Sequence, residues 1–121
     1  MDFETNKSIY LQIAATICNQ ILKGELEYGK RAPSIRNLAM ELEVNRNTVM
    51  RTFSYLQDKN ILINKRGIGF FVAEDATERI LINEKQTFFN KELPYLLERI
   101  QLLKLNTTDL QNLISTIKNN D

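Results

Sequence analysis

The chain has 121 residues, of which 43% are hydrophobic and 26% charged, and its net charge is +1. This is the length of one ordinary domain and the composition of a folded chain. It contains no histidine and a single cysteine, so histidine-dependent nucleophiles and paired-thiolate metal sites are excluded. Most hydrolytic and metal-dependent chemistry is therefore excluded. Together with the motifs discussed below, this leads us to expect a protein that is not an enzyme and that has no metal and no cofactor.

The start of the chain, Met1–Asn6, is acidic and polar, unlike the basic beginning of a signal peptide. No apolar run approaches the ~20 residues that a membrane span requires. A lone cysteine fits a reducing compartment. We expect a cytoplasmic protein without a membrane partner.

Charge is unevenly distributed along the chain. Residues 1–73 hold ten Lys and Arg against seven Asp and Glu, whereas residues 74–121 hold six against eight. This pattern fits a nucleic-acid module fused to a segment that does not touch nucleic acid. We place the boundary at Ala73–Thr77, which gives one domain over 1–73 and a second segment over 74–121.

A first amphipathic helix is predicted after Ser8, because isoleucines recur every four residues at Ile9, Ile13, Ile17 and Ile21. Ser8 suits the N-cap of this helix and Gly24 suits the position just after its end. Cys18 lies at the edge of the apolar stripe, which favours a small core residue over a reactive thiol.

Two short helices follow, separated by a tight turn. Ser34 is expected to cap the first, whose apolar residues are Ile35, Leu38, Ala39 and Leu42. Asn45 is expected to cap the second, whose apolar residues are Val49, Phe53 and Leu56. Two helices in this arrangement, the second opening with Asn-Arg-Asn-Thr, are typical of a helix-turn-helix.

After Asn60 the period changes to that of strands. Residues 61–65 and 70–72 are predicted to form a β-hairpin through the glycines of Arg66–Gly69. A three-helix unit followed by a hairpin is a winged helix-turn-helix. The expected fold class is therefore mainly α with a small β-hairpin, continued by a short all-helical dimerisation segment.

The segment 74–121 is expected to be helical throughout. Pro94 should kink or divide its first helix, and Thr107 or Thr108 should cap its last. An apolar band follows the first helix, and it is too small to enclose a drug-sized ligand within one chain. We expect this band to pair with a second copy of the chain, or alternatively to pack on its own winged helix in a monomer. The apolar band consists of Phe88, Phe89, Leu93, Leu96, Leu97 and Ile100.

Four motifs in order resemble the GntR family of bacterial transcription regulators. They are Ile9-Tyr-Leu-Gln-Ile, Ala32-Pro-Ser-Ile-Arg-Asn-Leu-Ala, Val44-Asn-Arg-Asn-Thr-Val-Met-Arg and Gly67-Ile-Gly-Phe-Phe-Val. The short helical tail further resembles the YtrA-like subfamily, whose members dimerise through this segment. The resemblance implies a dimeric repressor that binds an inverted-repeat operator, often that of a transporter operon. A small-molecule effector is not favoured.

Base reading requires planar donors, and affinity for DNA requires cations. Arg46 can pair with guanine and Asn47 with adenine, both from the start of the second helix of the helix-turn-helix. Met50 stands where many family members carry arginine, and it can contact only a thymine methyl. Lys65 and Arg66 flank the hairpin tip as phosphate ligands. The full candidate DNA-binding set is Ser34, Arg36, Asn45, Arg46, Asn47, Thr48, Met50, Arg51, Lys65, Arg66 and Gly67.

Several of these residues have a purely structural alternative. Asn45 can act only as a helix cap, and Arg51 can be an outward-facing solvated charge. Arg36 can pair with Glu41 or Glu43 on the surface. The whole unit can also be a protein-interaction module, in which case apolar residues are expected on the outer face of the second helix. An enzyme of the related type, with an aminotransferase domain after the same head, needs far more chain than follows residue 73.

Overall fold

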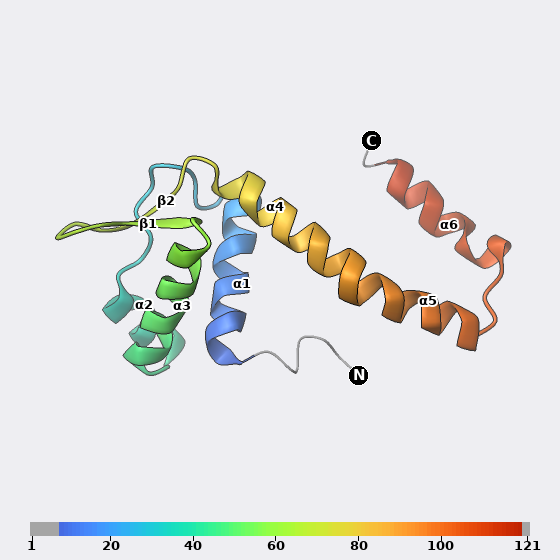
Figure 1. Ribbon diagram of the computed structural model, residues 1–121, viewed down its shortest axis with the longest axis horizontal. Helices are drawn as coiled ribbons and strands as arrows, with labels where there is room; N and C mark the ends of the chain where they lie inside the picture. Colours follow the sequence, from blue (N-terminus) through green and yellow to red (C-terminus); the bar gives the residue numbers. More distant parts are fainter. Residues whose placement is uncertain (1–7, 120–121) are drawn as a thin grey trace. The chain divides into compact units, whose positions relative to one another are not determined.

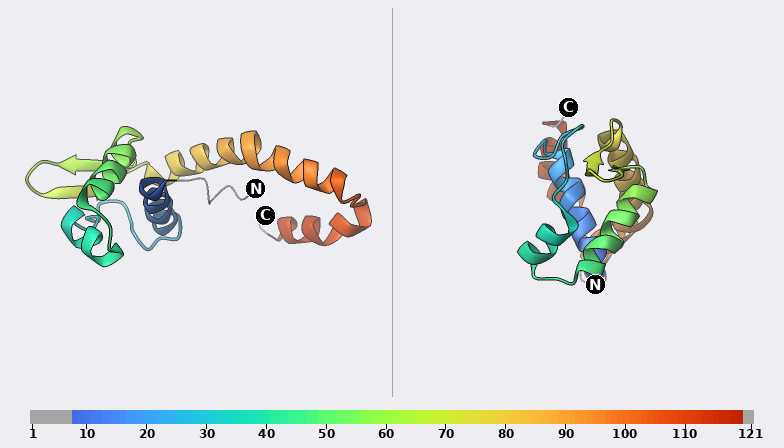
Figure 2. Two further views of the ribbon diagram at one scale, coloured as in Figure 1. Left: turned by 90° about the horizontal axis from the view of Figure 1, so that it is seen from below. Right: turned by 90° about the vertical axis from the view of Figure 1, so that its left-hand side faces the viewer.

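The computed structural model describes residues 8–119, so the polar start Met1–Asn6 lies outside it. Figures 1 and 2 show helices and one small hairpin, which confirms the predicted fold class. The elements in order are α1 (Ile9–Leu22), α2 (Ile35–Leu42), α3 (Arg46–Asp58), β1 (Leu62–Lys65), β2 (Gly69–Val72), α4 (Ala76–Thr87), the π-helical turn η2 (Phe88–Glu92), α5 (Leu93–Leu102) and α6 (Thr107–Lys118). No helix within residues 8–119 has the length and apolar character needed to cross a membrane.

The chain divides into two compact units, a head that ends at Glu84 and a tail that begins at Lys85. The boundary expected after residue 73 therefore moves along the chain. The physical reason is burial, because Ala76 and Ile80 on α4 are each about 1% exposed and belong to the core cluster of the head. The first part of α4 is thus part of the head.

The head is built around the contact between α1 and α3. The apolar stripes predicted for these helices are buried, except that Ile9 is exposed. Phe53 is completely buried and its ring meets that of Phe70 edge to face, with centroids 4.9 Å apart. This contact between α3 and β2 fixes the hairpin against the helical core, since such aromatic pairs add to the gain from burial alone.

Both helices of the helix-turn-helix begin at the predicted caps. The Ser34 hydroxyl oxygen accepts from the backbone N–H of Asn37 at 3.1 Å, and the Asn45 side-chain oxygen accepts from that of Asn47 at 2.7 Å. Between them, Glu43 ends α2 in the left-handed conformation, with φ of 56°. This short turn joins α2 to α3 and sets the direction in which α3 begins.

The hairpin pairs β1 and β2 antiparallel, with Leu62 opposite Val72 and Lys65 opposite Gly69. Asn60 precedes it with a positive φ of 60°, a conformation that asparagine tolerates better than most residues. A third backbone segment lies along β2, because the N–H of Ala32 donates to Phe70 O at 2.8 Å and the N–H of Val72 donates to Lys30 O at 3.1 Å. The loop before α2 is therefore hydrogen-bonded to the wing.

The tail is helical, as predicted, with two refinements. The interruption expected at Pro94 takes the form of the π-helical turn η2, which ends two residues before this proline. Proline lacks the N–H that would continue the regular ladder, so the preceding turn widens. The cap of α6 is Asn106 and not Thr107 or Thr108, because Asn106 and Asp109 form a reciprocal capping box.

Candidate nucleic-acid interface

The start of α3 carries the two residues proposed to read bases. Arg46 is the first residue of the helix and Asn47 the second, and both side chains are exposed. The Asn45 side chain is engaged as the cap, so its structural role is present in the molecule. Thr48 is half-buried, and its backbone N–H donates to Asn45 O at 3.0 Å.

The outer face of α3 is polar along its first two turns. Val49, Thr52, Phe53 and Leu56 form the buried face. At about 100° per residue, Asn47, Met50 and Arg51 point to the opposite side, where all three are exposed. A protein-binding face would require apolar side chains here, and Met50 is the only one among these three.

Thr52 was not singled out in the sequence, although it stands within the apolar stripe of α3. It is fully buried, and its hydroxyl donates to the backbone oxygen of Tyr10 at 2.8 Å. The Thr52 hydroxyl also lies within hydrogen-bond distance of the Thr48 carbonyl oxygen, at 3.1 Å. Thr52 therefore fastens the beginning of α1 to the middle of α3. A lone hydroxyl in an otherwise apolar stripe was the available signal.

Arg51 is exposed, but its guanidinium is not surrounded by solvent alone. Its Cζ lies 3.9 Å from the centre of the Tyr10 ring. The distance is that of a cation–π contact. Neither of the two readings of the sequence, a DNA ligand or a solvated charge, included this neighbour on α1.

Arg36 lies in the first turn of α2 and is exposed. The alternative of a surface ion pair is not found, since the only ion pair within residues 8–119 joins Arg79 to Asp75 at 2.7 Å. Ser34 caps the helix at whose beginning Arg36 stands. The amides and positive dipole end of a helix favour an anion at such a position.

The wing presents Lys65, Arg66 and Gly67 at its tip. All three are exposed, and the Lys65 ammonium lies 4.5 Å from the centre of the Phe71 ring. Gly67 has a φ of +81°, which L side chains rarely adopt, and this conformation explains the glycine. Lack of space does not, because a Cβ at that position would meet nothing within 4 Å. In the views of Figures 1 and 2 the hairpin projects from the head beyond α3.

One further cation was missed by sequence reasoning. Arg31 is exposed, and its side chain covers Gly69 so closely that a Cβ at Gly69 would lie 2.8 Å from Arg31 Nε. Together with Ser34, these residues line a hollow of about 190 Å³ between the start of β2 and the start of α2. A basic residue directly before the Ala-Pro-Ser motif was the available signal.

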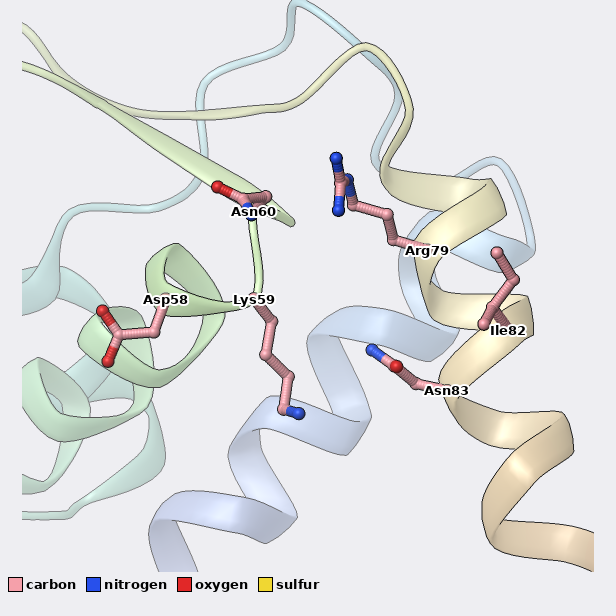
Figure 3. Close-up of a pocket in the computed structure, with 6 residues that line it drawn as sticks. All are labelled: Asp58, Lys59, Asn60, Arg79, Ile82 and Asn83. Carbon is pink, nitrogen blue, oxygen red and sulfur yellow. The ribbon is translucent and has the colours of Figure 1, made fainter.

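A second hollow, of about 350 Å³, lies at the opposite end of α3 from Arg46. Figure 3 shows Lys59 and Asn60 along one wall and Arg79 and Asn83 along the other. Most of these side chains are exposed, whereas pockets for drug-sized ligands bury most of the ligand surface. This end of the helix therefore provides surface cations that are remote from Arg46 and Asn47.

A winged helix-turn-helix with cations at the start of two helices and at the wing tip has the layout of a DNA-binding transcription regulator. Residues 9–72 match the family model described as bacterial regulatory proteins, gntR family. The match covers more than half of the chain. The protein belongs to the GntR family and is a transcriptional regulator of the helix-turn-helix type.

Individual relatives agree with this assignment. The chain is 42% identical to the transcriptional regulator YhcF of Bacillus subtilis over 61% of each protein, so it covers less than two thirds of that relative. It is 31% identical to the repressor YtrA of the same organism, over 80% of this chain and 74% of YtrA. Among solved structures, a GntR-family regulator from Bacteroides thetaiotaomicron is 37% identical with a TM-score of 0.74, over 94% of this chain and all of that one. The similarity to YtrA supports the YtrA-like assignment, and these relatives are regulators rather than enzymes.

Proposed function

We propose that the protein is a homodimeric repressor that binds an inverted-repeat operator in double-stranded DNA. The observation that carries the proposal is the pair of exposed side chains, Arg46 and Asn47, at the first two positions of α3. In the helix-turn-helix mode, the beginning of this helix enters the major groove. The operator of a bacterial regulator lies in the cytoplasm, so the proposal places the protein there.

The two side chains differ in what they can read. The Arg46 guanidinium offers parallel donors that match O6 and N7 of guanine, and the Asn47 amide matches N6 and N7 of adenine. Met50, 50% exposed on the same face, can contact only the methyl group of thymine. We therefore expect each operator half-site to contain a guanine read by Arg46 and an adenine read by Asn47. We expect no guanine at the base pair that Met50 contacts.

Phosphate contacts would hold α3 in register. The elements that flank α3 carry exposed cations: Arg36 at the start of α2, Arg31 beside the start of β2, and Lys65 and Arg66 at the wing tip. Phosphate contacts supply affinity without sequence information. Ser34, Asn45, Thr48 and Gly67 complete the proposed interface through caps, backbone groups and close approach.

The dimer is proposed from the apolar band of the tail. Phe89 is 60% exposed and Leu97 50% exposed, although both are large hydrophobic side chains. A contiguous exposed apolar face marks an interaction surface, and a two-fold pair is the commonest closed arrangement. Two winged helices in one dimer would engage half-sites about 10 bp apart, or one helical turn of DNA.

Repression is supported by the printed role of the relative YtrA, a transcriptional repressor. A transporter operon as the target is supported by MngR of Escherichia coli, a repressor of a transport and metabolism system that is 37% identical over 70 residues. The proposed activity needs neither a cofactor nor a small-molecule effector.

Selection of bound DNA from a random library tests the proposal. Wild-type protein should enrich an inverted repeat, and Arg46→Ala should weaken binding to it by about 1–3 kcal/mol and relax one position in each half-site. Arg79→Ala removes an equally charged residue that is paired with Asp75 and should bind like wild type. Failure to enrich any DNA would favour the protein-interaction alternative, and equal binding by Arg46→Ala would show that α3 does not read the groove.

A further inference from the structure

Cations and aromatic rings alternate along the side of α3 that faces α1. Arg51, Tyr55 and Lys59 recur every four residues, and Tyr10 of α1 is inserted between the first two. Arg51 Cζ lies 3.9 Å from the centre of the Tyr10 ring, and the rings of Tyr10 and Tyr55 meet edge to face with centroids 6.1 Å apart. At the far end, Lys59 Nζ lies 5.2 Å from the centre of the Tyr55 ring.

Tyr10 is held in this row from two directions. Its backbone oxygen accepts the buried hydroxyl of Thr52 at 2.8 Å, and its ring packs against Tyr55. Thr52 is completely buried, so this anchor is shielded from water. The ring face that Tyr10 offers to Arg51 is therefore fixed relative to α3.

Stacking on a ring has a specific effect on an arginine. The contact uses the flat face of the guanidinium and leaves the five N–H donors around its edge available. It also selects one orientation of a side chain that otherwise has many rotamers. Because Tyr10 lies on α1, the stacked guanidinium of Arg51 is held to the α1 side of the outer face that carries Asn47 and Met50.

We propose that Tyr10 is a positioning residue that presents Arg51 to a phosphate at the edge of the major groove. The inference rests on the proposed insertion of α3 into that groove and adds a residue of α1 that makes no contact with DNA itself. Arg51 follows Asn47 by four residues, so it lies one turn further along α3 than the N-terminal residues that are proposed to read bases. A side chain directed toward α1 at that height suits the sugar–phosphate backbone, and its contribution is independent of sequence.

The test is a double-mutant cycle measured as binding to the selected operator and to random duplex over a range of salt concentrations. Arg51→Ala should reduce the slope of log K against log salt by about 0.9, the value for one phosphate contact. Tyr10→Leu, which keeps an apolar side chain without a π face, should weaken both kinds of DNA about threefold to tenfold. In the Arg51→Ala background it should have no further effect. Tyr10→Phe, which keeps the aromatic ring, should bind DNA as tightly as wild type.

Lys59→Ala is the matched control, since it removes a stacked cation of the same row at the remote end of α3. Its salt slope should equal that of wild type. Equal weakening by Tyr10→Leu with and without Arg51 would assign Tyr10 a merely structural role and overturn the proposal. An unchanged slope for Arg51→Ala, with Arg46→Ala still defective, would overturn the proposal and leave the DNA-binding function standing. If Arg46→Ala also binds normally, the proposed function itself fails.

Discussion

Within residues 8–84 of the head, sixteen hydrophobic residues are buried and belong to one core cluster, whereas none of residues 85–119 of the tail is buried. Both regions have amphipathic helices with apolar stripes of similar length. The difference is that α3 packs against α1, α2 and β1, while the stripes of α5 and α6 stay accessible. An amphipathic stripe in a sequence therefore indicates a face that needs a partner, and the partner can be inside or outside the chain.

This contrast has an energetic consequence. Burying a large apolar side chain contributes about 1.5–3 kcal/mol relative to leaving it exposed. The head has gained this contribution within one chain. In the proposed dimer the tail would gain the same contribution from a second copy of the chain, so we expect head stability and tail association to respond to different substitutions.

The largest effect is expected from Phe53→Ala in the head. The side chain is 0% exposed, so its loss should lower the free energy of unfolding by about 3–5 kcal/mol through lost burial and a residual cavity. Urea titration followed by circular dichroism measures it. Phe89→Ala, which truncates a ring that is 60% exposed, should change head unfolding far less. Similar losses from the two variants would remove the distinction between the regions.

The second effect concerns association. Leu97→Asp places a carboxylate in the apolar band, and an unpaired polar group in an interface costs several kcal/mol, so monomers should predominate. The head should unfold as in wild type while operator affinity falls steeply, because the second half-site is lost. Sedimentation equilibrium at several protein concentrations measures the fractions of monomer and dimer.

Lys91→Asp serves as the control for association. It adds the same carboxylate at an exposed position of η2 outside the apolar band and should remain dimeric. A monomeric wild type, or a dimeric Leu97→Asp with full affinity, would assign the tail another role.

The third effect separates the regions by charge. Lys65→Ala/Arg66→Ala should weaken operator and random DNA alike and reduce the salt slope by about two, at roughly 0.9 per phosphate contact. The matched pair Lys104→Ala/Lys118→Ala removes two exposed lysines of the tail and should leave the slope unchanged. Equal slopes for wild type and the wing variant would mean that the hairpin points away from the duplex.

The smallest effect compares two helix caps of the same residue type. Asn45→Ala removes the hydrogen bond to Asn47 N–H and should lower head stability by about 1 kcal/mol. Asn106→Ala removes the bond to Asp109 N–H and should reduce helix content of α6 without a change in head unfolding. Circular dichroism during thermal unfolding distinguishes the two. A loss of head stability in Asn106→Ala would show that the regions are energetically coupled.

Local patterns were sufficient to predict the helices and the hairpin of the head. The four-residue spacing of Ile13, Ile17 and Ile21 appears as a buried face, and Ser34 and Asn45 cap the predicted helices. These features depend on neighbours within one turn, which a sequence shows directly. The cap of α6 was also available, since Asn106 and Asp109 have the spacing of a capping box.

Features that depend on contacts between distant segments could not be predicted in the same way. Ala76 and Ile80 are spaced like the tail residues that follow them, and only packing on the head distinguishes them. The stacking of Arg51 on Tyr10 joins residues from two helices. For the candidate site, the structure places the predicted residues on exposed elements around α3, while their contacts with DNA remain a prediction.

The backbone segment beside β2 has a mechanical consequence. Lys30 and Ala32 are hydrogen-bonded to the wing, and only Pro33 separates Ala32 from the cap of α2. The wing and the start of α2 are therefore joined by a short, hydrogen-bonded stretch of backbone. If Arg66 and Arg36 both bind phosphates as proposed, binding at Arg66 would raise the effective concentration of the next phosphate at Arg36, and the two contacts would be bivalent. Insertion of glycines between Ala32 and Ser34 would then uncouple the two phosphate contacts and weaken DNA binding, although every charged side chain would still be present.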